Sequence, residues 1–525
     1  MPLPPLNIFE KMRGLYTPVV NIRRHVLSEV GRMVVEEKPP HYIEEIPYRV
    51  IPKSTPTYRE SVFRERAIVR ERIRLAFGME LKEYGAHGPI HDDEVAECMK
   101  PVKILTRPIV NVIKIGCERC PEESYWVTNL CRGCIAHPCV SVCPKNAVSI
   151  VNDRSVIDQN LCIRCGRCAQ VCPYNAISYR ERPCSAACGV KAISSDSEGY
   201  AQINYDRCVS CGLCVVSCPF GAIAEKSEIA QIISALKSSQ HVYAEIAPAF
   251  VNQFGPLVSP AKLVVSLKKM GFRDVIEVAA GADRVVLQEA RELLELIQVK
   301  NGEKNEGEKG KSPNIIRKFV GTSCCTAWTM AAERNFPELK KLNISESFAP
   351  MVEAAKLIKA TDPEAIVVFI GPCIAKKEEC FQPEVAEVVN FVMTFEELAA
   401  MFQSFLIDPT KIEPQKDLHD ASTLGRGFPV AGGVAAAVIK QAQKISSVPL
   451  DIPYAAVDTL KDCMSLLKKL EGNKVVPAPL LVEGMACPFG CVGGPGTLAP
   501  INRARRAAQK YAKEADHQYP SDILL

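Results

Sequence analysis

Cysteine spacing constrains this chain more strongly than any other feature. The chain has 525 residues, 24 of which are cysteines, and sixteen of these lie between residues 101 and 225. Two stretches there, 162–173 and 208–219, repeat the pattern C-x2-C-x2-C-x3-C-P. With this spacing one loop wraps three corners of an iron–sulfur cube, while the fourth cysteine reaches a second cube. The repeats therefore predict 4Fe–4S clusters.

The other cysteines of this region form a variant run and an incomplete one. The variant run, 131–144, leads into "CPKNAV", which matches "CPYNAI" and "CPFGAI" in the two regular runs. The incomplete run, "CSAACGVKAI", keeps the three-residue gap between Cys184 and Cys188 but lacks the first two cysteines. Cys117 and Cys120 are a spare pair with the right internal gap. Sixteen cysteines with four ligands per cube predict four cubes.

The distances between runs indicate how they pair. Nineteen positions separate Cys143 from Cys162, and twenty separate Cys188 from Cys208. Connections of this length suit the two halves of a small ferredoxin fold, so we expect two modules with crossed ligation. The expected ligand sets are Cys131, Cys134 and Cys139 with Cys172; Cys162, Cys165 and Cys168 with Cys143; Cys208, Cys211 and Cys214 with Cys188; and Cys117, Cys120 and Cys184 with Cys218.

Zinc is the alternative ligand for such cysteines, because zinc sites also use paired Cys-x-x-Cys motifs. Four-cysteine runs with a trailing proline are not zinc-ribbon spacing, which favours iron–sulfur clusters. Cubes in series carry single electrons and perform no group chemistry unaided. Another part of the chain must therefore supply or consume electrons.

Composition sets the class of protein and its compartment. The chain is 47% hydrophobic and 24% charged, which is typical of a packed globular protein, and its formal charge of +4 is too small to indicate nucleic acid. We find no apolar signal-peptide core and no run of about 18 apolar residues that would predict a membrane span. Many cysteines without an export signal predict metal ligands in a reducing cytoplasm.

Three regions follow from the pattern along the chain. Residues 1–100 contain a charged stretch, 57–81, that predicts a helix, and we expect this region to be a helical wrapping or docking segment. Residues 101–225 form the double ferredoxin-like region. Residues 226–525 alternate helices with buried strands such as "AIVVFI" (365–370), apart from a polar loop at 300–314. The expected fold class is a multidomain α/β (α+β) protein.

Three further cysteine motifs lie in residues 226–525. They are "TSCCTAW" (322–328), "GPCIAKKEE" (371–379) and "EGMACPFGCVGGPG" (483–496). Adjacent cysteines are poorly placed for a structural disulfide, so Cys324 and Cys325 predict another role. The motifs resemble the three signatures of the iron-only (diiron) hydrogenases. "EIAPAF" (245–250), "GADRVVLQEARELL" (281–294) and "GFPVAGGV" (427–434) follow in the order of that family.

The resemblance implies a second kind of metal centre. Cys325, Cys373, Cys487 and Cys491 are expected to hold a fifth 4Fe–4S cluster, and Cys491 also to bridge to a diiron subsite with carbonyl, cyanide and azadithiolate ligands. Lys376 is expected to donate a hydrogen bond to a cyanide, as a point-charge donor. The resemblance further places five residues around the cofactor, namely Glu379, Met485, Phe428, Pro248 and Ala249.

Proton transfer is the role that the resemblance implies for the cysteine that is not a ligand. Cys324 is expected to carry the proton, because the pKa of a thiol is tunable toward neutrality. Glu289 and Glu292 share one face of a predicted helix and, with Ser345, match the family's proton path. Alone, two helix glutamates would more often be solvated. The sequence also departs from the commonest family pattern at Thr326, Gly371, Phe489 and Ala249.

The expected function is reversible oxidation of hydrogen to protons and electrons, in a protein that requires hydrogenase maturation proteins. A ferredoxin or another low-potential carrier is the expected electron partner, because low-potential cubes suit hydrogen chemistry. Two alternatives stay open. One is a slow hydrogen sensor. The single helix predicted after Gly496 argues against it, because this helix leaves little room for a signalling domain. The other is a hydrogenase-like iron–sulfur assembly protein without the diiron subsite.

Overall fold

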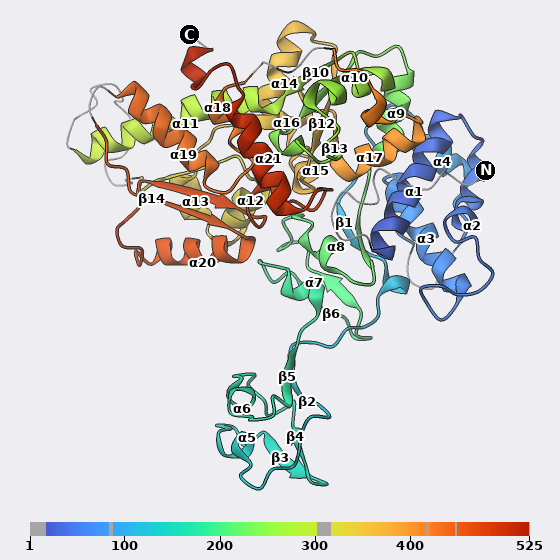
Figure 1. The fold of residues 1–525 in the computed structure, drawn as a ribbon, viewed down its shortest axis with the longest axis vertical. Coiled ribbons are helices and arrows are strands. Elements are labelled where there is room, and N and C mark those ends of the chain that lie inside the picture. Colours follow the sequence, from blue (N-terminus) through green and yellow to red (C-terminus); the bar gives the residue numbers. More distant parts are fainter. Residues whose placement is uncertain are drawn as a thin grey trace.

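The structure consists of a broad body with a small lobe projecting from it (Figure 1). It is a computed structural model that describes residues 17–82, 88–301, 317–415, 418, 421–446 and 449–523. The predicted polar loop at 300–314 therefore lies outside the described residues, apart from its first two. Among the described helices, none combines the length and the apolar character that crossing a membrane requires.

Two parallel sheets form the centre of the body. The larger has the strand order β10-β9-β12-β13 and the smaller the order β11-β15-β14. The predicted strand "AIVVFI" is confirmed as β12. The strands span β9 (Val242–Ile246), β10 (Asp274–Glu277), β12 (Ile366–Gly371), β13 (Phe391–Thr394), β11 (Val320–Gly321), β14 (Tyr454–Asp458) and β15 (Leu481–Met485).

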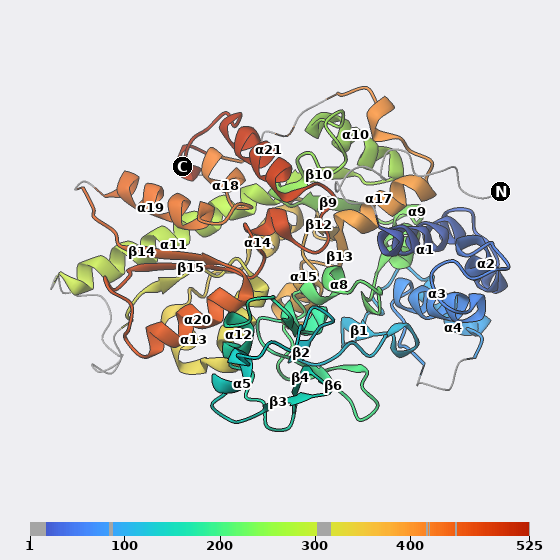
Figure 2. The same cartoon turned by 60° about the horizontal axis from the view of Figure 1, so that its bottom comes forward.

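Helices cover both sheets. Around the smaller sheet, Figures 1 and 2 place α11 and α19 on one side and α12, α13 and α20 on the other. The helices of this part of the body are α10 (Pro260–Met270), α11 (Val278–Lys300), α12 (Thr326–Asn335), α13 (Pro337–Asn343), α14 (Pro350–Thr361), α15 (Ala375–Glu379), α16 (Pro383–Ala386), α18 (Thr423–Arg426), α19 (Gly433–Ile445), α20 (Leu460–Glu471) and α21 (Ile501–Lys513).

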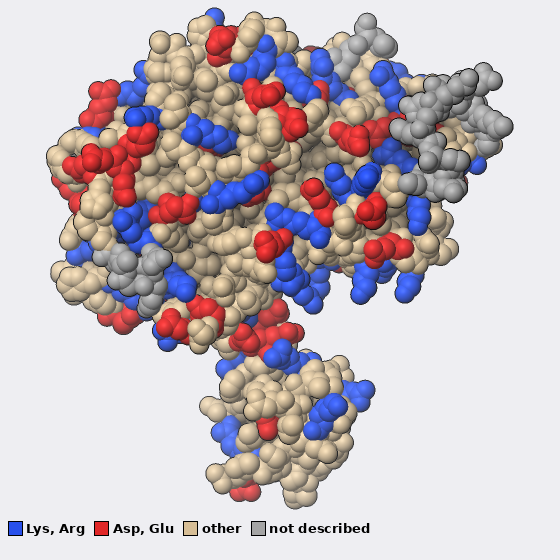
Figure 3. All heavy atoms as spheres, turned by 180° about the vertical axis from the view of Figure 1, so that it is seen from behind, with Lys and Arg blue, Asp and Glu red and all other residues tan. Residues whose placement is uncertain are grey.

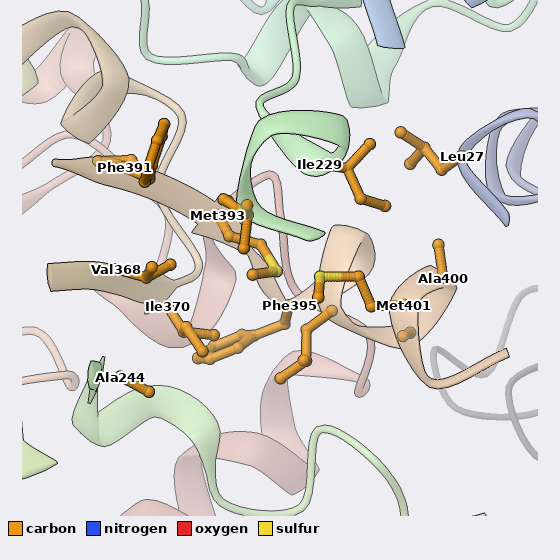
Figure 4. Packing of buried hydrophobic residues seen from close by; sticks show 14 of the residues in the cluster. Leu27, Ile229, Ala244, Val368, Ile370, Phe391, Met393, Phe395, Ala400 and Met401 are labelled. Carbon is orange, nitrogen blue, oxygen red and sulfur yellow. The ribbon is translucent and has the colours of Figure 1, made fainter. Parts of the chain in front are cut away.

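The main hydrophobic core lies between the larger sheet and helices from distant parts of the sequence. In Figure 4, Val368 and Ile370 of β12 and Met393 of β13 face Ile229 of α9 (Ile229–Lys237) and the helix α17 (Phe395–Ser404). All of these residues belong to one buried cluster. A parallel sheet covered in this way has strands that are apolar on both faces, which matches the burial of every residue of β13.

The N-terminal helices pack against this core instead of standing apart from it. The predicted helix within 57–81 is α3 (Val62–Ala76), and α1 (Pro18–Val35) lies against α17 and α9. Gly31 lets α1 approach closely, since an added Cβ there would lie 2.4 Å from the Ser404 Oγ. The other helices of this segment are α2 (Ile46–Val50) and α4 (Asp92–Cys98).

The lobe, residues 121–181, is a small two-fold repeat of strands and short helices. The hairpin β3 (Val148–Val151) with β4 (Arg154–Ile157) forms its far end, and the pair β2 (Ser124–Val127) with β5 (Ile177–Arg180) joins it to the body (Figure 1). Helices α5 (Pro138–Ser141) and α6 (Arg167–Gln170) complete it. The body-proximal elements are α7 (Pro183–Ala186), β6 (Ile193–Ser195), β7 (Ala201–Ile203), α8 (Leu213–Ser217), β1 (Val110–Val112) and β8 (Ile223–Glu225).

A buried ion pair network fastens the N-terminal helices to the body, and it yields a first prediction. Glu396 of α17 accepts hydrogen bonds from Arg23 and Arg24, and all three side chains are buried. Removing one member of a buried ion pair takes a counter-charge away from a buried charge, which costs about 3–5 kcal/mol. We expect Glu396→Ala to lower the free energy of unfolding by about this amount, measured by denaturant unfolding of the cluster-loaded protein.

Glu36 supplies the control for this prediction, because it pairs with Arg32 on the exposed side of α1. Exposed pairs contribute about 0–1 kcal/mol, so Glu36→Ala should have little effect. Equal losses in the two variants would contradict the anchoring role of Glu396.

Candidate functional site

The three C-terminal cysteine motifs meet because each follows the carboxyl end of a parallel strand. Cys325 follows β11 and begins α12, Cys373 follows β12, and Cys487 follows β15. Pro248 and Ala249 follow β9 in the short 3-10 helix η3 (Pro248–Phe250). Carboxyl ends of parallel strands are the usual place for a site in an α/β protein. Here two such sheets contribute to one site.

One cavity collects these residues. Nearly all the residues that the sequence placed at the cofactor line it, and Glu379 lies behind Lys376. The lining set includes Pro248, Ala249, Cys324, Cys325, Cys373, Lys376, Phe428, Met485, Cys487 and Cys491. Cys211, from the ferredoxin-like region, also lines this cavity, which the sequence did not predict.

The four expected ligands lie within electrostatic reach of one another. Burial raises the pKa of the Cys373 thiol to about 11, and the neighbouring Cys325 adds to this shift. The pKa values of Cys487 and Cys491 are likewise raised, first by burial and then by the other thiols. Cys373, Cys487 and Cys491 would not ionise together without a compensating positive charge. Iron bound among them supplies that charge, so the donor set fits a cluster.

Lys376 enters the same cavity in a fixed orientation. Its ammonium donates a hydrogen bond to the Glu379 Oε2 at 2.5 Å, and the Thr326 Oγ1 donates to the same oxygen at 2.6 Å. Burial acts to lower the pKa of Lys376, but the Glu379 carboxylate outweighs burial and holds the pKa above its ordinary value. Thr326, one of the departures from the family pattern, therefore helps to position a charged lysine.

A chain of hydrogen bonds runs through the interior from Glu289, whose carboxyl group interacts electrostatically with the thiol of Cys324. The Glu289 Oε1 accepts from the Ser323 amide at 2.9 Å and lies 3.4 Å from the Ser347 Oγ. The hydroxyls of Ser347 and Ser345 are 2.9 Å apart, and Ser345 donates to the Glu292 Oε1 at 2.7 Å. The sequence predicted Glu289, Ser345 and Glu292 but missed Ser347, which lies between the first two.

Burial tunes the inner end of this chain. It raises the pKa of Glu289 to about 8, a shift that the backbone amide of Ser323 partly offsets. The carboxyl therefore holds its proton through most of the neutral range. Its second oxygen makes no hydrogen bond to the residues that the structure describes. At the outer end, Arg317 donates to the Glu292 Oε2 at 2.7 Å, near the surface.

The last cysteine of each run in the ferredoxin-like region has the same local geometry. Each of the four runs, the incomplete one included, ends in a cysteine whose sulfur accepts a hydrogen bond from the amide of the alanine four residues later. These pairs are Cys143 with Ala147, Cys172 with Ala176, Cys188 with Ala192, and Cys218 with Ala222, at 3.2–3.3 Å. Amide donors of this kind stabilise a thiolate. The backbone of "CSAACGVKAI" therefore makes the same sulfur–amide hydrogen bond as the other three runs.

In the body-proximal half, electrostatic interactions between thiols show which cysteines lie near one another. Cys184 interacts with Cys218, Cys117 and Cys120, which is one of the four expected sets. The thiol of Cys214 interacts with Cys211, Cys208 and Cys188, which is another. Cys214 also interacts with Cys184, and Cys211 interacts with Cys373. The two sets therefore lie next to each other, and the second lies next to the cavity.

The fold and the thiol-lined cavity define an iron–sulfur redox protein, and comparison with known families identifies its type. Residues 240–495 match the family described as "Iron only hydrogenase large subunit, C-terminal domain". Residues 161–222 match a 4Fe–4S dicluster domain and residues 131–181 an iron–sulfur cluster-binding domain of the LdpA type. These matches support iron–sulfur clusters, and not zinc, in residues 131–222.

Individual relatives include hydrogenases and an assembly factor. Iron hydrogenase 1 of Clostridium pasteurianum is 28% identical over 67% of this chain and 67% of its own length. NADP-reducing hydrogenase subunit HndD of Solidesulfovibrio fructosivorans is 25% identical over 64% of this chain and 56% of its own. The cytosolic Fe-S cluster assembly factor narfl of Danio rerio is 23% identical over 50% and 71%. This chain thus spans roughly half to two thirds of the hydrogenases' length.

Among solved structures, a variant of the FeFe hydrogenase HydA1 of Chlamydomonas reinhardtii is similar with a TM-score of 0.47. The two chains share 18% identity over 57% of this chain and 92% of that one.

The packing behind Cys325 generates a second prediction. Trp328 is fully buried, and its indole N–H donates to the Thr322 carbonyl at 3.1 Å. A Cβ added to Gly484 would lie 2.3 Å from the Trp328 ring. We expect Gly484→Ala to lower stability by about 1–3 kcal/mol, because the displaced indole strains α12 and β15, which hold Cys325 and Cys487. Thermal unfolding and the iron content measure this loss.

Gly88→Ala is the matched control, because a Cβ there meets nothing within 4 Å. If Gly484→Ala unfolds at the temperature of the natural protein and keeps its iron, the packing of Trp328 does not support the ligand loop.

Proposed function

We propose that this protein interconverts hydrogen with protons and electrons at a diiron centre in the cavity. Cys325, Cys373, Cys487 and Cys491 would hold a 4Fe–4S cluster, with the Cys491 sulfur also bridging to a diiron group that carries carbonyl, cyanide and azadithiolate ligands. When bound, this group supplies the chemistry that splits or forms hydrogen. Residues 226–525 would form this catalytic domain, and residues 101–225 the electron relay.

The observation that carries the proposal is a hydrogen-bonded row of carboxyls and hydroxyls, Glu289, Ser347, Ser345 and Glu292, whose inner carboxyl interacts with the thiol of Cys324. A cluster held only for structure or assembly needs ligands, but it does not need a free thiol beside them that leads into a row of carboxyls and hydroxyls. In the proposal Cys324 passes protons to Glu289, and Ser347 and Ser345 pass them on to Glu292 at the surface. Each hydroxyl accepts one proton and gives up its own, so the route works in both directions.

The remaining residues bind, orient and exclude water. Lys376, held by Glu379 and Thr326, would donate a hydrogen bond to a cyanide. Met485, Phe428, Pro248 and Ala249 give the cavity an apolar wall, which strengthens every electrostatic interaction within it. Electrons would leave through the cluster of the Cys211 set, because Cys211 lines the same cavity.

The second candidate function is iron–sulfur cluster assembly, favoured by the similarity to narfl of Danio rerio. Infrared spectroscopy of protein produced together with hydrogenase maturation enzymes separates the two. We expect carbonyl and cyanide stretching bands together with hydrogen turnover. Full cluster loading without such bands would overturn the diiron proposal and support an assembly role. Bands with turnover orders of magnitude below ordinary hydrogenases would instead indicate a sensor.

Cys324→Ser provides a direct test of the proton route. Serine is a far weaker acid than cysteine, so we expect hydrogen turnover to fall about 100-fold or more, the scale of general acid–base catalysis. The infrared bands and iron content should persist, because Cys324 is not among the ligands. Cys98→Ser, in a buried thiol of the N-terminal segment, is the matched control. Undiminished turnover in Cys324→Ser would refute the route.

Ser347 tests the step that the structure adds to the route. We expect Ser347→Ala to lower turnover roughly tenfold or more, because no hydroxyl then joins Glu289 to Ser345. Ser347→Thr keeps the hydroxyl and should retain most of the activity. Reduction of the 4Fe–4S clusters by dithionite should be the same in both variants. Equal turnover in the alanine and threonine variants would show that protons bypass Ser347.

A further inference from the structure

We infer that the far end of the lobe is the docking surface for a small, acidic, one-electron carrier protein. This surface, the tip, comprises residues 128–156, and Figure 1 shows α5 and the β3–β4 hairpin at the end of the molecule. The inference rests on the proposed electron relay, because a relay needs a point where electrons enter or leave.

The order of the cysteine sets places the tip at the end of the relay. The Cys211 set borders the cavity, and the set of Cys117, Cys120 and Cys184 borders the Cys211 set. Cys120 lies four residues before β2 and Cys184 four residues after β5, so this second set lies where the lobe joins the body. The lobe beyond it holds the two remaining expected sets.

Contacts inside the lobe show which of its two cysteine loops is farther from the body. The Arg164 guanidinium, next to Cys165, lies 3.8 Å from the Glu123 carboxylate at the base of the lobe. The Cys131 sulfur instead accepts a hydrogen bond at 3.5 Å from the amide of Ser155 in the far hairpin. Cys139 also lies 3.5 Å from the Ser155 hydroxyl. The loop that begins at Cys131 is therefore the outer one.

The tip exposes large apolar side chains, which are more often buried in a protein interior. Ile135 is 97% exposed, the highest value among the large hydrophobic residues, and Leu130 is 60% exposed. On the outer face of the hairpin, Val151 and Val156 are 50% and 44% exposed. Exposed apolar groups gathered in one small region are typical of a protein contact site.

The charge of the tip selects an acidic partner. Its basic residues are Arg132, Lys145 and Arg154, and Asp153 is the one acidic residue within 128–156. Figure 3 shows the lobe as a largely uncharged surface with scattered Lys and Arg. Backbone amides, not these side chains, donate the recorded hydrogen bonds to the sulfurs of Cys131 and Cys143. Arg154 donates hydrogen bonds to the Thr128 carbonyl and the Asn129 Oδ1, whereas Arg132 and Lys145 are exposed. These two cations can steer an acidic carrier into contact.

The experiment compares binding of a purified acidic two-cube ferredoxin to the cluster-loaded protein by calorimetry at low and high salt. The double variant Arg132→Glu/Lys145→Glu should raise the dissociation constant at least roughly tenfold and weaken its salt dependence, because two attractions become repulsions. Ile135→Ser should weaken binding at both salt concentrations. Arg503→Glu/Arg506→Glu on exposed positions of α21 is the matched control and should leave binding unchanged.

Two further measurements keep docking separate from catalysis. Photoreduced ferredoxin should bleach the visible absorption of the clusters more slowly in the tip variants, and this readout requires no hydrogen chemistry. Hydrogen oxidation with a small viologen dye should be unchanged in them. Unchanged ferredoxin binding in the tip variants would overturn the docking inference, as would equal weakening in the α21 control or self-association through the tip. Absence of dye-coupled hydrogen oxidation in the natural protein would instead overturn the proposed function.

Discussion

The grouping of four cysteines in one cavity imposes the strongest constraint on this molecule. Cys325, Cys373, Cys487 and Cys491 come from three strand ends and one short helix. Desolvation and the neighbouring thiols raise the pKa values of Cys373, Cys487 and Cys491 and so oppose their ionisation. Only iron, or another concentrated positive charge, makes this arrangement favourable. The surrounding fold holds these four cysteines close together. Two parallel sheets converge at their carboxyl ends, Trp328 braces the ligand loop from behind, and Lys376 adds a cation at the edge.

The chemistry of the site could be predicted from local sequence, whereas the connections between its parts could not. A cube takes three ligands from one short loop, so the spacing of Cys162, Cys165 and Cys168 predicts it directly. Ser347 reaches Glu289 only because helix α11 packs beside the chain that follows α13, and nothing in "NISESFAP" reveals that contact. Thr326 is similar: the sequence shows a departure from the family, and the structure shows that its hydroxyl holds Glu379.

The N-terminal segment was the least predictable part. Its helix α3 followed from the apolar spacing within 57–81, but its position did not. Burial of charged residues such as Arg23 and Arg24 is exceptional unless they are paired. Their partner Glu396 lies more than 370 residues away. Long-range pairing of this kind leaves no periodic signal, so the sequence predicts a wrapping or docking segment without showing where it packs.

The proposed outlets for protons and for electrons lie in different parts of the molecule, and this affects how the protein could be attached to an electrode. In the proposed function, protons reach water at Glu292 in the body, while electrons cross at the tip of a slender lobe (Figure 1). A negatively charged carbon electrode that adsorbs the basic, apolar tip would hold the protein upright and leave the proton outlet in bulk solution. Current would then be drawn without blocking proton exchange. The lobe thus places the proposed electron contact at one end of the molecule and the proposed catalytic cavity in the body at the other.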